Sequence, residues 1–441
     1  MSYLTDRRRF LKSTALTGVG VFVAGKAAAE DSKSPNERIR FACIGVGGKG
    51  GSDSSDAAKE GDIVAICDVD DKTLEKASKF YPKAAKYNDY RKMLDEMGGS
   101  IDAVTVSTPD HMHAPASALA MRMGKACFTQ KPLTRSIWEA RELGKIAAEA
   151  KVATQMGNQG TAANSLRKTA AVVRSGALGN IKEVHVWTNR PIWPQGGGRP
   201  AEAPVPENVH WDLWLGCAPV RPYAPGYHPF AWRGWWDFGS GALGDMACHT
   251  VNMPFMALNL RDPSGVQATT SGHNQETYPK WSVIEYDFPK LDDREALKMV
   301  WYDGGKKPSS DLFEGEQVSE TGVLLIGDKG KLFAPGDYCE RGYKLMAGAT
   351  DPGDVEFEAS PGHFQEFARA IKGGPEARSN FANYAVPLTE TILLGNLAVW
   401  AATAAETPGK KIEWDAVNLK ATNAPEVELV VKPTYREGYT L

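Results

Sequence analysis

The chain has 441 residues, of which 42% are hydrophobic and 24% are charged, as in an ordinary globular protein. Its length predicts two domains, or one domain with a large extension. The formal net charge is −3, and without the first 29 residues 46 basic and 53 acidic side chains remain, a net charge of −7. That balance excludes a basic field that would bind nucleic acid or an anionic membrane.

The N-terminus has the three parts of an export signal. Residues 7–12 read RRRFLK, which matches the twin-arginine pattern. A weakly apolar run too short to span a bilayer follows, and residues 27–29 form an Ala-Ala-Ala cleavage site. We therefore expect a twin-arginine signal peptide over 1–29, a linker over 30–37, and export of the folded protein to a periplasm or an equivalent space.

Apolar runs and amphipathic stretches alternate between residues 38 and 157. The sequence predicts strands at 40–44, 63–67, 101–107, 126–129 and 152–156, and helices at 71–80, 90–97, 114–123 and 135–150. This alternation is typical of a doubly wound parallel sheet in an α/β fold.

A glycine-rich turn follows the first predicted strand. It contains Gly45, Gly47, Gly48 and Gly50 in a G-x-G-x-x-G pattern, with Lys49 in the same loop. The first glycine of such a pattern allows the turn, the second admits phosphates, and the third lets helix and strand pack closely. The helix N-terminus would face a pyrophosphate. The pattern predicts a Rossmann domain over residues 38–157 that binds NAD or NADP.

Asp68 follows the second predicted strand, 23 residues after Gly45. That spacing is near the one expected for the acid that binds the adenosine ribose. Its carboxylate would repel a 2′-phosphate and so favours NAD, whereas Lys49 could still reach such a phosphate and leaves NADP open. The alternative is a plain strand–helix turn in which Asp68 caps a helix.

Two polar stretches follow the strands at 101–107 and 126–129. The first contains Ser107, Thr108, Pro109, His111 and His113, and the second is Gln130-Lys131-Pro132. Ligands bind outside the carboxyl ends of parallel strands, so we expect both stretches beside the nucleotide. The histidines could instead begin a helix, or bind a metal, for which a third ligand is missing from the pattern. Lys131 could also be an ordinary surface lysine, but its position favours the crevice.

The pattern changes after residue 157. We expect helices at 161–174, 362–371 and 387–404, strands at 181–189, 266–271, 282–288, 297–302, 322–326 and 331–333, an ordered loop over 191–229, an extended segment at 411–414 and a surface arm at 435–441. The strand-like runs predict an α/β domain over 158–441 with a large, mostly antiparallel open sheet. We expect this domain to bind the substrate.

Asp245 and His249 lie four residues apart in GSGALGDMACH, so on a helix they would share one face. A histidine beside a carboxylate suits acid–base catalysis near neutral pH. The alternative is a carboxylate near a helix N-terminus and a core histidine.

Seven of the twelve tryptophans lie between Trp187 and Trp236. Indole faces suit stacking on a sugar, although most of these side chains could pack in a core. The candidate substrate contacts in and near this region are Asn158, Tyr227, His228, Trp232, Arg233 and Trp235. The six cysteines form no CxxC pair, so we expect small core side chains and no metal site.

The chain resembles the Gfo/Idh/MocA family, which includes glucose–fructose oxidoreductase and inositol dehydrogenase. The resemblance rests on IRFACIGVGGKGG, ICDVD, STPDHMHAP, QKPL, GALGDMACH, HFQEFARAIKGG and PLTETILLGNLA. It implies a Rossmann domain followed by an α/β domain whose open sheet often forms dimers or tetramers. By motif position, Lys131, Asp245 and His249 look like the catalytic group of this family. Gln130 stands where the family usually has Glu, which bears on the pKa and orientation of Lys131.

Three functions are consistent with these features. In a sugar or polyol oxidoreductase, His249 would take a hydroxyl proton, Lys131 would stabilise the developing alkoxide, and Asp245 would hold a neighbouring hydroxyl or the histidine. In an NAD-dependent glycosidase, transient oxidation would permit elimination, with Tyr227 or His228 as candidates for the extra acid or base. A non-catalytic sugar-binding protein would have little use for the catalytic group. Because free NAD is scarce outside the cytoplasm, we expect a tightly held cofactor.

Overall fold

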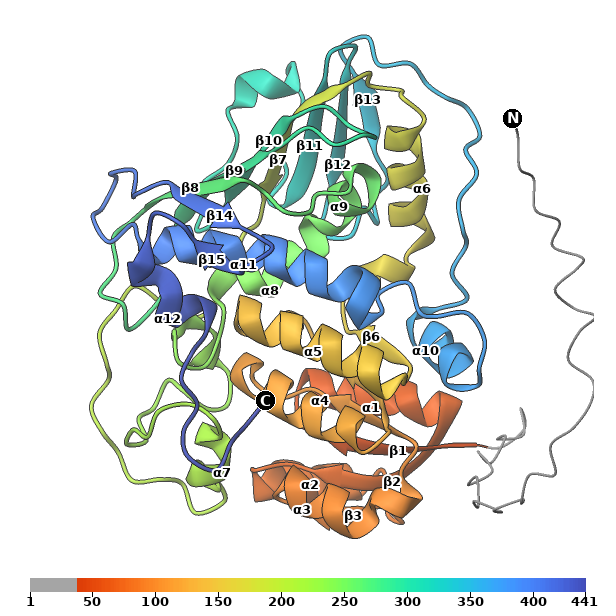
Figure 1. Cartoon of the computed structure of the whole chain (residues 1–441), viewed down its shortest axis with the longest axis vertical. Helices are drawn as coiled ribbons and strands as arrows, with labels where there is room; N and C mark the ends of the chain where they lie inside the picture. Colours follow the sequence, from red (N-terminus) through yellow and green to blue (C-terminus); the bar gives the residue numbers. More distant parts are fainter. Residues whose placement is uncertain (1–37) are drawn as a thin grey trace, which may run out of the picture. The chain divides into compact units, whose positions relative to one another are not determined.

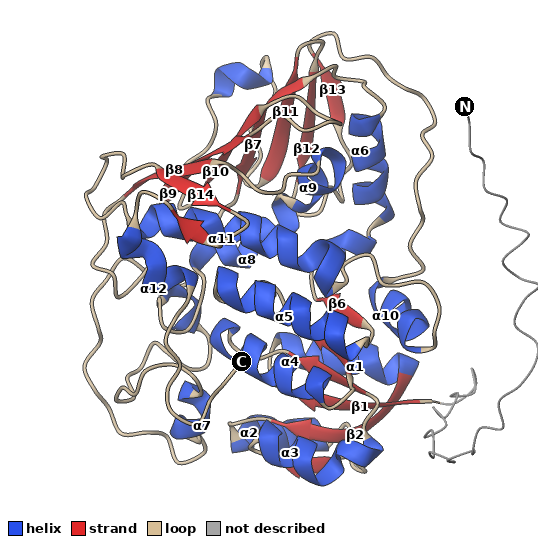
Figure 2. Cartoon of the chain, in the orientation of Figure 1, coloured by secondary structure: helices blue, strands red, loops and turns tan. Residues whose placement is uncertain are grey.

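The structure, a computed structural model, describes residues 38–441, and the predicted signal peptide and linker lie outside the described residues. Two sheets and the helices around them form this part of the chain (Figures 1 and 2). The smaller sheet has six strands and the larger has nine. The fold is therefore the predicted one, a Rossmann domain followed by an α/β domain with a mostly antiparallel sheet.

The six-stranded sheet is parallel throughout, in the order β3-β2-β1-β4-β5-β6. Its strands are β1 (Ile39–Ile44), β2 (Gly61–Cys67), β3 (Ala85–Tyr87), β4 (Ala103–Val106), β5 (Ala126–Thr129) and β6 (Thr154–Met156). The strand order reverses between β1 and β4, and ligands bind in the crevice outside such a switch point. The sequence did not predict β3, whose three residues carry little periodic signal.

Helices cover both faces of this sheet. They are α1 (Lys49–Glu60), α2 (Asp71–Ser78), α3 (Tyr90–Met97), α4 (His113–Arg122) and α5 (Ile137–Ala150). Phe41 of β1 packs with α1 in one buried cluster, whereas Ala42 and Ile44 belong to the larger cluster on the other face. This alternation along β1 is the expected period of a strand that is buried on both sides.

The nine-stranded sheet has the order β13-β12-β11-β7-β10-β9-β8-β14-β15, and only β7 and β10 are parallel neighbours. Its strands are β7 (Ile181–Trp187), β8 (Gly265–Thr270), β9 (Ser282–Phe288), β10 (Leu297–Tyr302), β11 (Gly322–Gly327), β12 (Lys331–Pro335), β13 (Lys344–Met346), β14 (Ile412–Asp415) and β15 (Lys420–Ala421). The sequence did not predict β13 and β15, which are also very short.

Helices connect the two sheets. Those after β6 are α6 (Asn164–Arg174), α7 (Trp211–Leu215), α8 (Gly241–Thr250), α9 (Asn252–Leu258), α10 (His363–Ile371), α11 (Val386–Trp400) and α12 (Glu428–Val431). The almost entirely buried helix α11 packs on α5 and α8, and on β8 and β9, and Figure 1 shows it between the two sheets. This packing joins the domains and fixes α8 beside the switch point.

The C-terminal arm is more firmly attached than a free surface segment would be. The Tyr435 hydroxyl donates a hydrogen bond to Glu139 of α5 at 2.6 Å, and the Arg436 guanidinium donates to the Gly216 carbonyl at 2.9 Å. The arm therefore ties the end of the chain back to the first domain.

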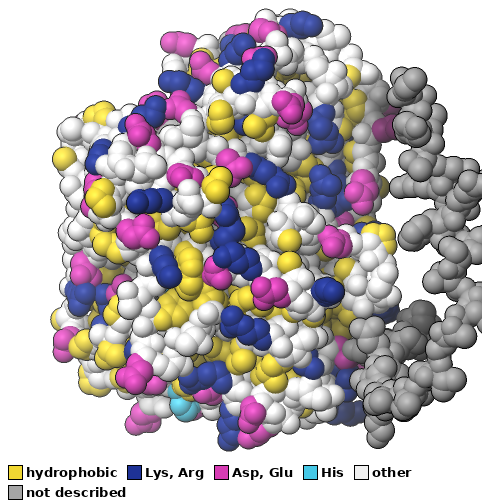
Figure 3. Space-filling view, in the orientation of Figure 1, with side chains coloured by type: hydrophobic (Ala, Val, Ile, Leu, Met, Phe, Trp, Pro, Cys, Tyr) yellow, Lys and Arg dark blue, Asp and Glu magenta, His cyan; other side chains and the backbone are white. Residues whose placement is uncertain are grey.

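Acidic and basic side chains are interspersed on the face of the molecule drawn in Figure 3. Within residues 38–441, no helix is long and apolar enough to cross a membrane. All six cysteines are buried and unpaired, as their spacing predicted.

Candidate active site

A cavity of about 720 Å³ lies outside the carboxyl ends of β1 and β4 and extends to α8. Both domains contribute side chains to it. The predicted site residues that line it are Gly45, Gly47, Gly48, Lys49, Asp68, Ser107, Thr108, Pro109, His113, Gln130, Lys131, His228, Trp232, Arg233, Asp245 and His249. The fold thus gathers residues from six separate stretches of the sequence around one space.

The glycine turn has the geometry that its pattern predicted. Gly45 has a φ of 78°, and a Cβ there would lie 2.5 Å from the Ser107 carbonyl oxygen. A Cβ on Gly50 would lie 2.0 Å from the Gly45 carbonyl oxygen, so only glycine allows helix α1 to approach β1 this closely. Gly48 has a φ of 50° and open space where a Cβ would be. The turn therefore offers an open backbone surface at a helix N-terminus, which fits a pyrophosphate.

Asp68 lies at the end of β2 and faces the same cavity. Its carboxylate accepts hydrogen bonds from the backbone N–H groups of Val46, at 3.0 Å, and Asp70, at 2.9 Å. Asp70, not Asp68, is the N-cap of α2. Two backbone bonds fix the orientation of the Asp68 carboxylate and leave lone pairs for a ribose hydroxyl.

Lys131 and Asp245 form a buried ion pair that lines the same cavity. The Lys131 Nζ atom lies 2.7 Å from both Oδ1 and the backbone oxygen of Asp245. The Nε atoms of Arg233 and Arg190 lie 3.3 Å and 4.0 Å from the same carboxylate. Burial alone would raise the pKa of Asp245, but Lys131 and Arg233 together lower it below its usual value. The carboxylate thus stays ionised and holds the Lys131 ammonium in place.

His249 lies on the same face of α8 as Asp245 and is 2% exposed. Burial lowers its pKa well below the usual value, and the Lys131 ammonium lowers it further, so the ring is neutral at pH 7. Its Nδ1 atom is buried without a hydrogen-bond partner. A neutral ring with an open nitrogen in a cavity can accept a proton from a bound hydroxyl.

Five predicted site residues do not line the cavity. Gly50 packs against Gly45, as its predicted role requires. His111 is fully buried between Trp214 and Phe238, with ring centroids at 5.6 and 5.4 Å. Tyr227 and Trp235 are also buried, with ring centroids 4.8 Å apart, so aromatic packing holds these three side chains away from the cavity.

Asn158 is the fifth of these residues. It is fully buried directly after β6, and both polar atoms of its amide have no hydrogen-bond partner. Unsatisfied buried amides are uncommon, so this side chain has unused hydrogen-bonding capacity close to Gln159, which does line the cavity.

The two remaining histidines have clear contacts. Both ring nitrogens of His113 lie against carbonyl oxygens, of Pro132 at 2.8 Å and of Thr108 at 2.9 Å, so the ring joins the two loops that carry Lys131 and Pro109. The Nε2 atom of His228 lies 3.2 Å from Oδ2 of Asp70. His228 thus lines the cavity beside Asp70, and its role as an extra acid or base stays a prediction.

The sequence missed two groups near Asp245 and His249. The ring of Tyr338, from the connection between β12 and β13, is edge-on to His249 with centroids 4.8 Å apart. Arg190 lies just after β7 and lines the cavity. Neither belongs to a local motif, so only the tertiary fold could have identified them.

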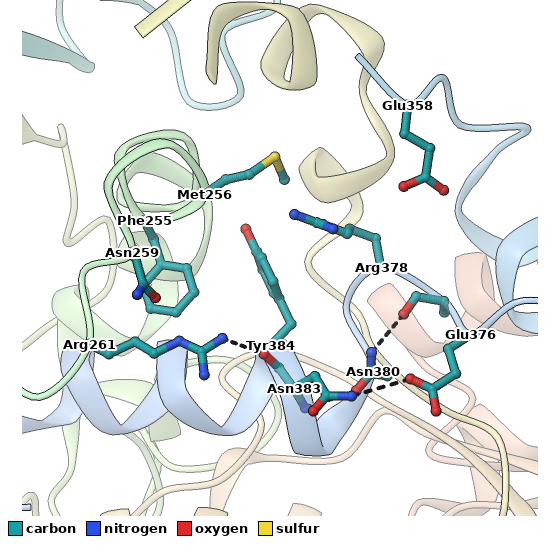
Figure 4. A pocket seen from close by; sticks show the side chains of 11 residues that line it. Phe255, Met256, Asn259, Arg261, Glu358, Glu376, Arg378, Asn380, Asn383 and Tyr384 are labelled. Atoms are coloured by element: carbon teal, nitrogen blue, oxygen red, sulfur yellow. Dashed lines mark hydrogen bonds between the residues drawn. The ribbon is translucent and has the colours of Figure 1, made fainter. Parts of the chain in front are cut away.

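A second hollow, of about 400 Å³, lies near α9 and the start of α11 (Figure 4). Arg261 and Arg378 line it together with Glu358 and Glu376. Because the two positive and two negative charges balance, this hollow favours neither an anionic nor a cationic ligand. Among residues 38–441, no group of three or more His, Cys, Asp or Glu side chains could hold a metal ion. The cavity at the glycine turn is therefore the candidate active site.

Family models agree with the fold and with the glycine turn. Residues 39–158 match the model for the Gfo/Idh/MocA "oxidoreductase family, NAD-binding Rossmann fold", and residues 161–441 match its "C-terminal alpha/beta domain". The chain belongs to the Gfo/Idh/MocA oxidoreductase family. Its first domain is accordingly an NAD-binding Rossmann domain.

Curated relatives of this Gfo/Idh/MocA member include glycosidases. A glycosyl hydrolase family 109 protein of Solibacter usitatus is 34% identical over 155 residues, and an alpha-N-acetylgalactosaminidase of Shewanella oneidensis is 31% identical over 165 residues. These alignments cover 32% and 31% of this chain, and only 35% and 36% of the respective relatives. The chain thus matches about a third of the length of each.

Solved structures with the same fold include two sugar-related enzymes. The WlbA dehydrogenase of Bordetella pertussis, in complex with NADH and UDP-GlcNAcA, has a TM-score of 0.61 at 16% identity over 86% of this chain and 99% of its own. The aldose-aldose oxidoreductase of Caulobacter crescentus has a TM-score of 0.58 at 15% identity over 85% and 100%. At these identities the likeness establishes the fold.

Proposed function

We propose that this protein is an NAD-dependent oxidoreductase that acts on a hydroxyl of a sugar, glycoside or polyol. The observation that carries the proposal is the Lys131–Asp245 pair beside neutral His249, in the cavity that also contains the glycine turn. NAD, when bound, would accept the hydride from the substrate carbon. Gly45, Gly47, Gly48 and Asp68 would hold the dinucleotide.

Lys131, Asp245 and His249 then each have one task in the reaction. His249 accepts the proton of the substrate hydroxyl because its pKa is low enough to keep it neutral. The Lys131 ammonium donates a hydrogen bond to the same oxygen and stabilises the developing negative charge. Asp245 keeps that ammonium in position, whereas the sequence predicted that it would hold a neighbouring hydroxyl or the histidine.

Glycoside cleavage is the second candidate, and the family 109 relatives and Tyr338 favour it. Oxidation of one sugar carbon acidifies the neighbouring C–H group, whose proton a base can remove as the glycosidic oxygen leaves. Water then adds to the double bond and the hydride returns, so the reaction has no net redox change. Burial raises the pKa of Tyr338, and the nearby Asp337 raises it further, so its hydroxyl stays protonated and can donate a proton to the leaving oxygen.

An assay of the purified protein with nitrophenyl glycosides separates these functions. Net formation of NADH or a stable keto sugar supports oxidoreduction, and release of nitrophenol without net redox change supports cleavage. If cleavage occurs, we expect Tyr338→Phe to lose about 10²–10³-fold of it while binding of NAD is unchanged. A protein that neither contains nor binds NAD would contradict both functions.

Asp68 should determine the choice between NAD and NADP. Replacing it by Asn removes the charge that repels a 2′-phosphate, so we expect the preference for NAD over NADP to fall about tenfold. Isothermal titration calorimetry with both dinucleotides measures this ratio. Asp62→Asn, at an exposed position, is the matched control. An unchanged ratio in Asp68→Asn would contradict the assignment.

The proposal includes export, a captive cofactor and a homodimer or homotetramer. The RRRFLK sequence supports twin-arginine export, a route that carries folded proteins with their cofactors. A protein loaded before export would keep its NAD through closed redox cycles. Nucleotide that co-purifies with the exported protein, and that withstands extensive dialysis, is the expected sign.

A further inference from the structure

A buried carboxylate connects the glycine-turn helix to the segment that carries Lys131. Asp53 of α1 is fully buried. Its carboxylate accepts hydrogen bonds from the Ser107 hydroxyl and from the Gln130 side-chain amide, each at 2.8 Å, and forms an ion pair with Lys49. Of these three donors, Lys49 lies at the start of α1, Ser107 lies in the loop after β4, and Gln130 lies in the loop after β5. All three of these segments line the cavity, so Asp53 joins them from behind.

Gln130 continues this connection to Lys131. Its Nε2 atom donates to Asp53, and its Oε1 atom accepts from the Lys131 backbone N–H at 3.3 Å. Gly157 makes the space for it, because a Cβ there would lie 2.5 Å from the Gln130 Nε2 atom. An amide can make both bonds because it has a donor and an acceptor end, whereas an ionised carboxylate can only accept.

We propose that Asp53 is a positioning residue that acts through Gln130 on the segment that carries Lys131, and that a carboxylate at position 53 requires an amide at position 130. A glutamate at 130 would put two carboxylates within 2.8 Å in a buried site, where like charges cannot both ionise. Only the catalytic role of Lys131 rests on the proposed function; the pairing of positions 53 and 130 does not.

The charged groups around the pair decide the pH behaviour. Lys49 is the cation that contacts Asp53, and the Cys43 thiol of β1 lies close enough for Asp53 to raise its pKa after the larger effect of burial. In a Gln130→Glu variant, one proton shared by the two carboxyl groups would restore the hydrogen bond. The folded pair would then hold a proton at a pH where the unfolded chain releases it, so the destabilisation is full at high pH and is relieved as the pH falls.

A charge-exchange experiment on the NAD-loaded full-length protein tests the proposal. At pH 8 we expect Gln130→Glu to lower the melting temperature by about 5 °C and to weaken NADH binding about tenfold. Asp53→Asn should also lower the melting temperature, but this loss should not become smaller at low pH. In the double variant D53N/Q130E, the amide of residue 53 can donate to the carboxylate of residue 130. This variant should recover at least half of the loss in melting temperature and half of the loss in NADH affinity. Asp56→Asn, a partly exposed carboxylate on the same helix, is the matched control.

Two further readouts keep the test decisive. The melting-temperature deficit of Gln130→Glu should shrink between pH 8 and pH 5.5, which a simple packing defect would not do. The acylation rate of Lys131 by acetic anhydride, relative to Lys59 and followed by peptide mass spectrometry, should change in both single variants and move back in the double variant. Additive losses in the double variant, or a pH-independent deficit in Gln130→Glu, would overturn the proposal. Neither measurement needs a sugar substrate, so the result is independent of the reaction assay.

Discussion

Replacing Lys131 by alanine is expected to lower the turnover of the NAD-loaded protein by about 10²–10³-fold, the effect of losing one donor to a developing oxyanion. Lys131 is the ammonium that contacts Asp245 at 2.7 Å, and it is 14% exposed. No other lysine contacts this carboxylate among the ion pairs of the described residues. Steady-state rates on whichever glycoside the protein accepts, with the affinity for NADH measured in parallel, give the result.

The affinity for NADH should change less than threefold in this variant, because the glycine turn and Asp68 are unaltered. Lys145→Ala, which removes an exposed lysine of α5, is the control for loss of a positive charge. A rate for Lys131→Ala within tenfold of the wild-type rate would exclude Lys131 from the catalytic group.

His249→Ala should lower turnover by about 10²–10⁴-fold through loss of the proton acceptor. The pH profile of the wild-type protein carries a second test. Because the pKa of His249 lies well below its usual value of about 6.5, the base stays neutral and the rate should be level between pH 6.5 and pH 8. The rate should fall only below that range, as the ring becomes protonated.

The free energy of unfolding should also depend on the protonation of His249. In the unfolded chain the ring of His249 binds a proton below about pH 6.5, whereas the folded protein keeps it neutral, so stability should decrease as the pH falls below that value. The decrease should be smaller in His249→Ala, as measured by urea unfolding at pH 7.5 and pH 5.5. His210→Asn, at an exposed position outside the cavity, is the control. A wild-type rate that already falls below pH 7.5 would contradict the assignment of His249 as the base.

Local sequence was enough to predict the first domain and the dinucleotide turn. Gly45 and Gly50 have roles set by contacts within one strand–turn–helix unit, and Asp68 follows directly from the end of the next strand. Asp245 and His249 could be paired because a helix brings residues four apart to one face. Each of these inferences depends on short-range backbone geometry that recurs in many proteins.

The tertiary contacts decided what the sequence left open. Tyr227 and Trp235 could have faced a sugar or a core, and only the packing of the aromatic cluster places them in the core. His228 could not be assigned to Asp70, nor Tyr338 to His249, because the partners are more than 80 residues apart. The partner of Gln130 could not be predicted either, because Asp53 lies 77 residues earlier in the chain.

The most direct test of the account is a crystal structure of the protein with NAD. It should have the pyrophosphate at Gly47 and Gly48, a ribose hydroxyl bonded to Asp68, and the nicotinamide ring in contact with Lys131 and His249. That arrangement would put the hydride acceptor beside the proton acceptor, as the proposed function requires. A nicotinamide ring bound away from both side chains, or a dinucleotide bound outside this cavity, would contradict it.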